Sequence, residues 1–301
     1  MDNWTEVEQF ARLFYGRGDV YGSNEGGCVK RPLTKEVLLG HFADAPIGVY
    51  PMIQRNGEWK VAWGCVDFDT ADAHEHAFRL YNALAEAGIT SWVERSRSKG
   101  YHVWVFPSAV VPAEIMRYAL IVACQVAEVP TTEVNPKQVT LKDGQYGNYV
   151  RLPYARLDTD DETTNRQRII TTDDQPIPFS EFVASATSQR TPVELLERIA
   201  SYYQPPAATE QPTGDYEYDA TLDEAMSVLS PLGKVIWRDG PLQGKDRSTT
   251  LAKLGHECVR SGLNPSQTRT VIRTADQRWG KYHMRPNGEL EIDKLVVRVH
   301  S

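Results

Sequence analysis

The chain has 301 residues, with 33 Lys and Arg against 40 Asp and Glu, which gives a formal net charge of −7 at pH 7. This excess of acids argues against a protein that coats nucleic acid non-specifically, although it leaves room for a local basic groove. There is no run of about 18 apolar residues, so no membrane-spanning helix is expected. The first residues lack a basic segment followed by an apolar one, so no secretory signal is expected either.

The four cysteines are scattered and form no C-x-x-C pair. This spacing predicts neither a zinc site nor a disulfide framework. Reduced thiols and a cytoplasmic location are therefore the expectation.

In chain order, the first predicted elements are helices over 4–15 and 34–42, separated by a glycine-containing loop at 21–27. Residues 48–53 and 59–65 are predicted to pair as a hairpin, because Asn56-Gly57 between them is a strong turn signal.

The next segment alternates strands and helices. Strands are predicted over 61–68, 91–95, 101–106 and 131–134, and helices over 72–87 and 112–127. This order, β-α-β-β-α-β, is that of a ferredoxin-like or RRM-like unit and indicates an α+β fold. The first strand of such a unit is central and is flanked by the third and fourth.

Asp67 and Asp69 lie at the end of the first predicted strand. Residues i and i+2 of a strand share a face, so two carboxylates would lie side by side, an arrangement that suits Mg²⁺ or Mn²⁺. D-x-D also occurs as helix-capping chemistry, which is the alternative for the pair taken alone. His102 on the third strand and Glu133 on the fourth would join the pair if both face the open side, since a one-residue slip turns a strand side chain over.

The remainder of the chain divides at a Pro-rich stretch. A short helix is predicted over 192–203, followed by a linker over 204–218. Helices over 219–229, 248–261, 265–277 and 292–299 then form a helical unit, 219–301. This unit is locally basic at Lys245, Arg247, Arg260, Arg269, Arg273, Arg278, Lys281 and Arg285.

Four motifs in residues 45–185 resemble those of the archaeo-eukaryotic primase superfamily, in particular the primase-polymerases of phages, plasmids and bacterial repair systems. The first is an apolar strand that ends in D-x-D, here Val66-Asp67-Phe68-Asp69. The second is S-x-S-K/R-G-x-H, here 96–102, and the third is a single acid on a later strand, here Glu133. Residues 146–154 are similar to the G-N-x-x-R/A-L-P segment of phage-type members.

The resemblance implies a role for each matching position. Asp67, Asp69 and Glu133 would be the catalytic acids and would hold two Mg²⁺ or Mn²⁺ ions. The residues that would bind the incoming nucleotide are Ser96, Ser98, Lys99, His102, Lys137 and Arg151. Competing candidates for the third acid are the acidic run 158–162 and the pair Asp173-Asp174, with Asp173 the stronger.

The resemblance also implies an organisation and a function. Residues 1–203 would form the catalytic domain, with an RRM-like sheet beside an N-terminal α/β module. Residues 219–301 would form a small helical domain for template binding or priming, or else a stabilising cap. The predicted activity is that of a DNA primase-polymerase of a bacterial cytoplasm or phage-infected cell, which uses NTPs or dNTPs on single-stranded DNA.

A separate replicative helicase is a possible partner, and no membrane is expected to be involved. Two alternatives stay open. One is a gap-filling repair polymerase of the end-joining type, and the other is a non-catalytic RRM-like nucleic-acid-binding protein.

Overall fold

A computed structural model describes residues 4–97, 100–157, 167–205, 221–241, 247–283, 285 and 287–300. The chain forms two compact units, Met1–Gln204 and Pro205–Ser301, and each is described by itself. Residues 206–218 of the predicted linker lie outside the described residues, as do Ser98, Lys99 and the acidic run 158–162.

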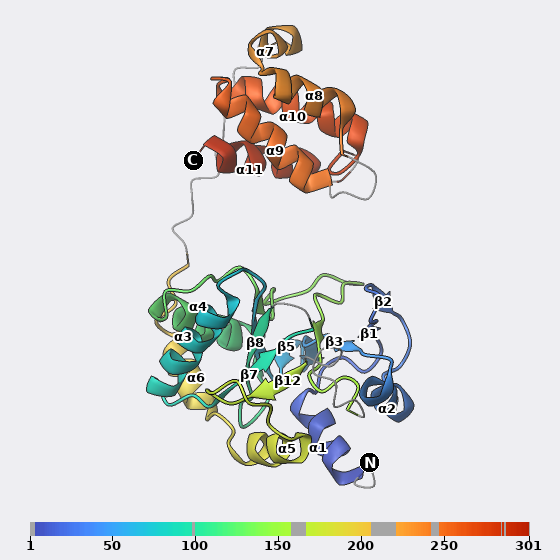
Figure 1. Cartoon of the computed structure of the whole chain (residues 1–301), viewed down its shortest axis with the longest axis vertical. Helices are drawn as coiled ribbons and strands as arrows, with labels where there is room; N and C mark the ends of the chain where they lie inside the picture. Colours follow the sequence, from blue (N-terminus) through green and yellow to red (C-terminus); the bar gives the residue numbers. More distant parts are fainter. Residues whose placement is uncertain are drawn as a thin grey trace. The chain divides into compact units, whose positions relative to one another are not determined.

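The first unit is built on a five-stranded sheet in which all neighbouring strands are antiparallel (Figure 1). In spatial order its strands are β10 (Val134–Asn135), β6 (Gly64–Phe68), β8 (Tyr101–Val105), β7 (Ser91–Arg95) and β12 (Arg168–Ile170). With α3 (Ala73–Glu86) and α4 (Ala113–Val126), the order along the chain is β6-α3-β7-β8-α4-β10. Strand β6 thus lies between β8 and β10.

One face of this sheet is covered by α3, α4 and α6 (Val193–Ala200), which Figure 1 shows together on one side of it. Helix α3 buries Ala73, Ala77, Leu80 and Leu84 because they recur at helical spacing. They pack in one core with Val66 and Val103 of the sheet. Gly88 follows α3 with a φ of +79°, which suits the residue after a helix end.

The opposite face carries a second, aromatic core formed with α1 (Trp4–Leu13), α2 (Lys35–Ala43) and α5 (Phe179–Ser188). Trp104 of β8 meets Phe14 edge-on, with ring centroids 4.9 Å apart. Trp63 and Trp104 are fully buried, so both belong to the core and neither is available to stack a base. This core covers only part of the face, and its uncovered end holds the polar residues described below.

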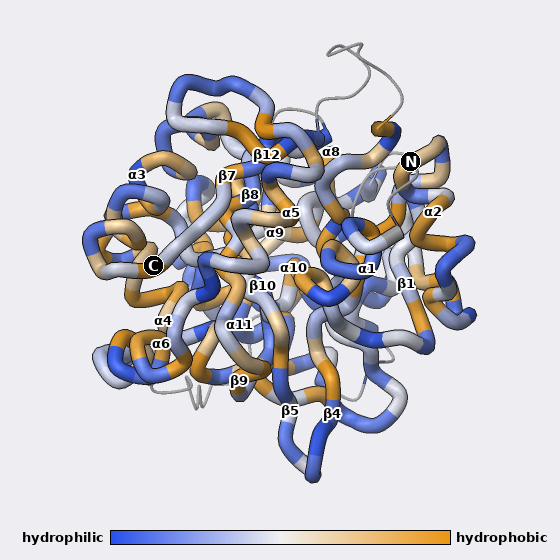
Figure 2. Tube along the Cα trace, turned by 90° about the horizontal axis from the view of Figure 1, so that it is seen from below, coloured by the Kyte–Doolittle hydropathy of each residue, from blue (hydrophilic) through white to orange (hydrophobic). Residues whose placement is uncertain are grey.

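Two smaller sheets complete the unit. One is ordered β11 (Val150–Arg151), β3 (Gly48–Val49), β1 (Tyr21–Gly22) and β2 (Cys28–Val29), and the other β4 (Ile53–Arg55), β5 (Glu58–Val61) and β9 (Val111–Pro112). The predicted turn at Asn56-Gly57 joins β4 to β5, and Figure 2 shows this hairpin projecting with a hydrophilic tip. The strand predicted over 61–68 is divided, because Ala62 and Trp63 separate β5 from β6 and the two strands belong to different sheets.

The second unit is helical in its described residues. Its helices are α7 (Leu222–Val228), α8 (Pro231–Asp239), α9 (Arg247–Arg260), α10 (Pro265–Trp279) and α11 (Gly288–His300). Thr221 with Glu224, and Asn264 with Gln267, form capping boxes that begin α7 and α10. Helix α8 was not predicted, although Ser230-Pro231 is a normal helix start.

Several of the predicted basic residues of this unit pair with its own acids. Arg269 contacts Glu289 and Asp293 at 2.8 and 2.5 Å, and Arg273 also contacts Glu289. Arg260 pairs with Glu257. The contacts of Arg269 and Arg273 tie α10 to α11, whereas the Arg260–Glu257 pair lies within α9.

Across the described parts of both units, no helix combines the length and the apolar character needed to cross a membrane.

Candidate active site

Four ionisable side chains form a row across the five-stranded sheet. Asp67 of β6 lies opposite His102 of β8, and His102 lies opposite Glu94 of β7. On the other side of β6, the Asp67 amide donates to the Glu133 carbonyl at 3.1 Å, which places Glu133 beside Asp67. Opposite residues of antiparallel strands point to the same face, so Glu133, Asp67, His102 and Glu94 share the face opposite α3, α4 and α6.

Glu94 is the member of this row that sequence reasoning missed. Its side chain is completely buried, and its Oε2 accepts hydrogen bonds from His102 Nδ1 at 2.8 Å and from Trp104 Nε1 at 2.6 Å. The available signal was strand parity, since Trp92 and Glu94 alternate with the buried Val93. These two hydrogen bonds fix the orientation of the His102 ring.

The row opens into a cavity of about 440 Å³. Seven of the nine predicted site residues line it, namely Asp67, Asp69, Ser96, His102, Glu133, Lys137 and Arg151. The other two, Ser98 and Lys99, lie outside the described residues. The lining residues that were not predicted are Tyr50, Arg97, Asn135, Gly147, Asn148, Tyr149, Val150 and Gln167.

The charges in this cavity interact strongly. Burial lowers the pKa of His102, but the Glu94 and Asp67 carboxylates outweigh it and raise the pKa to about 10. The pKa of Asp69 is raised by desolvation and by repulsion from Asp67 and Glu133, and His102 and Arg151 oppose that rise. The three acids are therefore close enough to repel one another, as carboxylates that share a cation would be.

Asp67 and Asp69 have the chemistry of a divalent-cation site. Asp67 Oδ1 is buried, lies 3.4 Å from His102 Nε2, and accepts no hydrogen bond from the described residues. Its ion pair with His102 supplies positive charge, and a carboxylate oxygen is also a ligand that a divalent cation takes. Glu133 instead pairs with Lys137. As the described residues stand, no three His, Cys, Asp or Glu side chains converge on one ion position.

The absence of a side chain at Gly100 leaves room for the Asp69 carboxylate at the edge of the cavity. A Cβ at this position would lie 2.3 Å from Asp69 Oδ1 and 2.7 Å from the Phe68 carbonyl oxygen. The Ser96 amide donates to the Gly100 carbonyl at 2.9 Å and closes the turn between β7 and β8. Only glycine allows this turn to approach the Asp69 carboxylate so closely.

The competing acids for the third position lie elsewhere. Neither Asp173 nor Asp174 lines the cavity. Asp174 Oδ2 instead contacts His74 Nε2 of α3 at 3.0 Å. Of the described candidates, Glu133 is the one that shares a cavity with Asp67 and Asp69.

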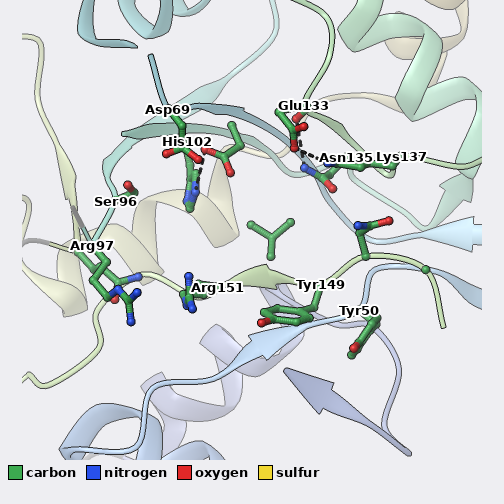
Figure 3. A pocket seen from close by; sticks show the side chains of 15 residues that line it. Tyr50, Asp69, Ser96, Arg97, His102, Glu133, Asn135, Lys137, Tyr149 and Arg151 are labelled. Carbon is green, nitrogen blue, oxygen red and sulfur yellow. Dashed lines mark hydrogen bonds and ion pairs between the residues drawn. The ribbon is translucent and has the colours of Figure 1, made fainter. Parts of the chain in front are cut away.

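Two arginines converge on the opposite side of the cavity. Arg97 donates to Asn24 Oδ1 at 3.2 Å, and Arg151 donates to the Asn24 carbonyl at 3.2 Å. Figure 3 shows these arginines side by side, across the cavity from Asp69, His102 and Glu133. Two guanidinium groups that lie close together can bind an anion such as a phosphate between them. The arrangement therefore offers oxygen ligands for a cation on one side and donors for an anion on the other.

Comparison with known proteins gives three findings. None of the curated proteins matches the chain. The crystal structure of primase RepB′ aligns over 98% of this chain and 94% of that one, with 16% identity and a TM-score of 0.30, a likeness too small to support a conclusion. The family described as "TOTE conflict system, Archaeo-Eukaryotic Primase domain" matches residues 28–178. This segment contains all the residues that line the cavity. The chain belongs to this archaeo-eukaryotic primase family.

Proposed function

We propose that this protein is a DNA primase-polymerase that catalyses metal-dependent, template-directed nucleotidyl transfer from NTPs or dNTPs on single-stranded DNA. The observation that carries the proposal is the cavity itself, where Asp67, Asp69 and Glu133 face Arg97 and Arg151. An RRM-like core is the corresponding fold, and the β6-α3-β7-β8-α4-β10 order supports it. Membership of an archaeo-eukaryotic primase family supports the same activity.

Asp67 and Asp69 would hold Mg²⁺ or Mn²⁺, and Glu133 would be the third acid of a two-metal site. When bound, such ions lower the pKa of an attacking 3′-hydroxyl and offset the charge of a triphosphate. The mutual repulsion of the acids supports this assignment, as does the buried Asp67 Oδ1, whose charged contact among the described residues is the ion pair with His102. Lys137, which pairs with Glu133, would hold that carboxylate in place.

His102, Ser96 and the two arginines would bind the triphosphate. With Nδ1 engaged by Glu94, the His102 ring presents Nε2 toward Asp67, the side of the ring that lies in the cavity. Arg97 and Arg151 offer planar pairs of N–H donors that match phosphate oxygens. Ser98 and Lys99 retain the phosphate-binding role that the motif predicts for them.

Three arginines of the second unit would contribute little to DNA binding. Arg260, Arg269 and Arg273 are engaged by acids within the bundle, which favours the stabilising cap over template binding for these residues. Their charge is locally balanced, and a polyanion would have to displace it.

The proposal is tested with the full chain, Mg²⁺ or Mn²⁺, labelled nucleotides and a single-stranded template. Template-dependent incorporation is expected, and incorporation on a template without a primer would establish primase activity. Extension of pre-annealed ends alone would instead indicate the repair polymerase. Incorporation that ignores the template base would contradict the proposal.

A further inference from the structure

Tyr149 lies on two glycines of the small sheet. A Cβ on Gly22 would lie 2.3–2.5 Å from three atoms of the Tyr149 ring, and a Cβ on Gly48 would lie 2.3 Å from one of them. Gly22 of β1 and Gly48 of β3 are direct partners in the strand register. The ring therefore rests on a patch of sheet that carries no side chains.

Backbone conformation does not explain these glycines. Neither Gly22 nor Gly48 is among the glycines with positive φ, so both positions suit an L-residue as far as the backbone is concerned. For Gly22, the ring of Tyr149 is the nearest obstacle at each of the three closest contacts. The space that the ring occupies thus explains Gly22, and it explains Gly48 together with the Val150 carbonyl oxygen, which would lie 2.8 Å from a Cβ there.

The Tyr149 ring is also contacted by Tyr50 and lines the cavity. Tyr50 meets it edge-on, with ring centroids 5.4 Å apart and an interplanar angle of 65°. Tyr149 and Tyr50 both line the cavity, and Figure 3 shows them across it from Asp69, His102 and Glu133. Arg151, in β11 and two residues after Tyr149, is one of the arginines that line the cavity.

We infer that Tyr149 is a stacking platform for a nucleobase bound in this cavity, and that Gly22 and Gly48 exist to let its ring lie flat. An aromatic ring supported on one face and open on the other is the geometry on which nucleobases stack, and such stacking tolerates any base. The cavity volume of about 440 Å³ is in the range of sites for whole small ligands. This inference rests on the proposed function, because it assigns the base-binding end of the same site.

The test compares a ligand that has a base with one that lacks it. Binding of Mg²⁺–ATP, Mg²⁺–tripolyphosphate and a short single-stranded oligodeoxynucleotide is measured by calorimetry for the wild type, Tyr149→Phe and Tyr149→Ala. Tyr149→Ala is expected to weaken ATP binding about 5- to 150-fold, the loss of one base–aromatic stack, and to leave tripolyphosphate binding unchanged. Tyr149→Phe is expected to bind like the wild type.

The role of Gly22 is tested by introducing Gly22→Ala into the wild type and into Tyr149→Ala. Gly22→Ala is expected to weaken ATP binding by pushing the Tyr149 ring out of its plane, and to have no effect when it is added to Tyr149→Ala. Such non-additivity would assign the effect of the glycine to the ring. Additive effects would show that Gly22 acts on something else.

The outcomes separate the inference from the proposed function. If wild-type protein binds ATP and Tyr149→Ala binds it equally well, and binds the oligonucleotide equally well, the platform is wrong and the nucleotide site stands. If only oligonucleotide binding falls, the platform holds a base of the DNA strand. If the wild type binds neither ATP nor tripolyphosphate, the nucleotide site and the platform fail together.

Discussion

His102 donates a 2.8 Å hydrogen bond from Nδ1 to Oε2 of Glu94, a carboxylate with no exposed surface. The same oxygen also accepts from Trp104 Nε1 of the aromatic core. A buried acid anchored in the core thus sets the orientation and the charge of a histidine that lines the cavity. Such supporting contacts determine how accurately a site residue is placed.

Replacing Glu94 with Gln should therefore lower the pKa of His102. A hydrogen bond to a charged group is worth about 1.5–3 kcal/mol, so a fall of about 1–2 pH units is expected together with a roughly tenfold or greater loss of nucleotide incorporation. Titration of the His102 imidazole by NMR in metal-free protein measures the pKa. Glu86→Gln, at the exposed end of α3, is the control. An unchanged His102 titration would mean that Glu94 does not hold the proton.

Because the buried His41 ring resists protonation, the folded protein should be less stable in mild acid than at neutral pH. The Ile47 amide donates to His41 Nδ1 and His41 Nε2–H donates to the Pro153 carbonyl, so the buried ring is neutral, and desolvation lowers its pKa to about 4. The folded state binds fewer protons than the unfolded state between pH 6.5 and 4, so stability falls as the pH falls through that window, by roughly 3 kcal/mol at most.

Urea unfolding as a function of pH measures this effect. His41→Gln should be less stable than the wild type at neutral pH and should show a shallower loss between pH 6.5 and 4. Parallel pH profiles for the two proteins would contradict the assignment to His41.

Gly100→Ala should damage the site through Asp69. The new Cβ would lie 2.3 Å from Asp69 Oδ1 and 2.7 Å from a backbone oxygen, and overpacking of this kind costs about 1–3 kcal/mol. Nucleotide incorporation should fall by tenfold or more, because the Asp69 carboxylate, which we propose to bind the metal, must move. Gly18→Ala is the matched control, since its Cβ meets nothing within 4 Å and its φ is not positive. Equal losses in both variants would indicate a general effect on folding.

The third acid can be identified by two single variants. Glu133→Gln is expected to abolish incorporation, because Glu133 lines the cavity with Asp67 and Asp69. Asp173→Asn is expected to retain near-wild-type activity, since Asp173 lies outside the cavity lining, in the turn after β12. Incorporation assays on the same primed template compare them directly. The reverse ranking would transfer the metal-binding role to Asp173.

The sequence predicted the residues of the site better than the contacts between them. Asp67, Asp69, His102 and Glu133 stand in recognisable motifs, but the sequence left open whether His102 and Glu133 share a face with the aspartates. Glu94 and Asn24 stand in no such motif. The role of Glu94 depends on the register of β7 against β8, and that of Asn24 on the approach of the β1–β2 turn to two arginines. Register and approach are set by tertiary packing, which single-sequence patterns do not encode.

Helix α5 is a different case. Its apolar residues have helical spacing, so the helix could have been predicted from the sequence. They are Phe179, Phe182, Val183 and Ala186. The division of residues 58–68 between two sheets could not be predicted, because both halves have strand propensity and the break at Ala62–Trp63 is apolar and buried. The packing of Tyr149 on its two glycines could not be predicted either, since these residues come together only when β1, β3 and β11 pair.

The central claim is that Asp67 and Asp69 support metal-dependent nucleotidyl transfer. It is tested most directly by template-dependent nucleotide incorporation with Mg²⁺ or Mn²⁺, comparing the wild type with the double variant Asp67→Asn, Asp69→Asn. The wild type should incorporate nucleotides and lose this activity when the metal is chelated, and the double variant should be inactive while it unfolds with an intact cooperative transition. Equal incorporation by the two proteins would contradict the assignment.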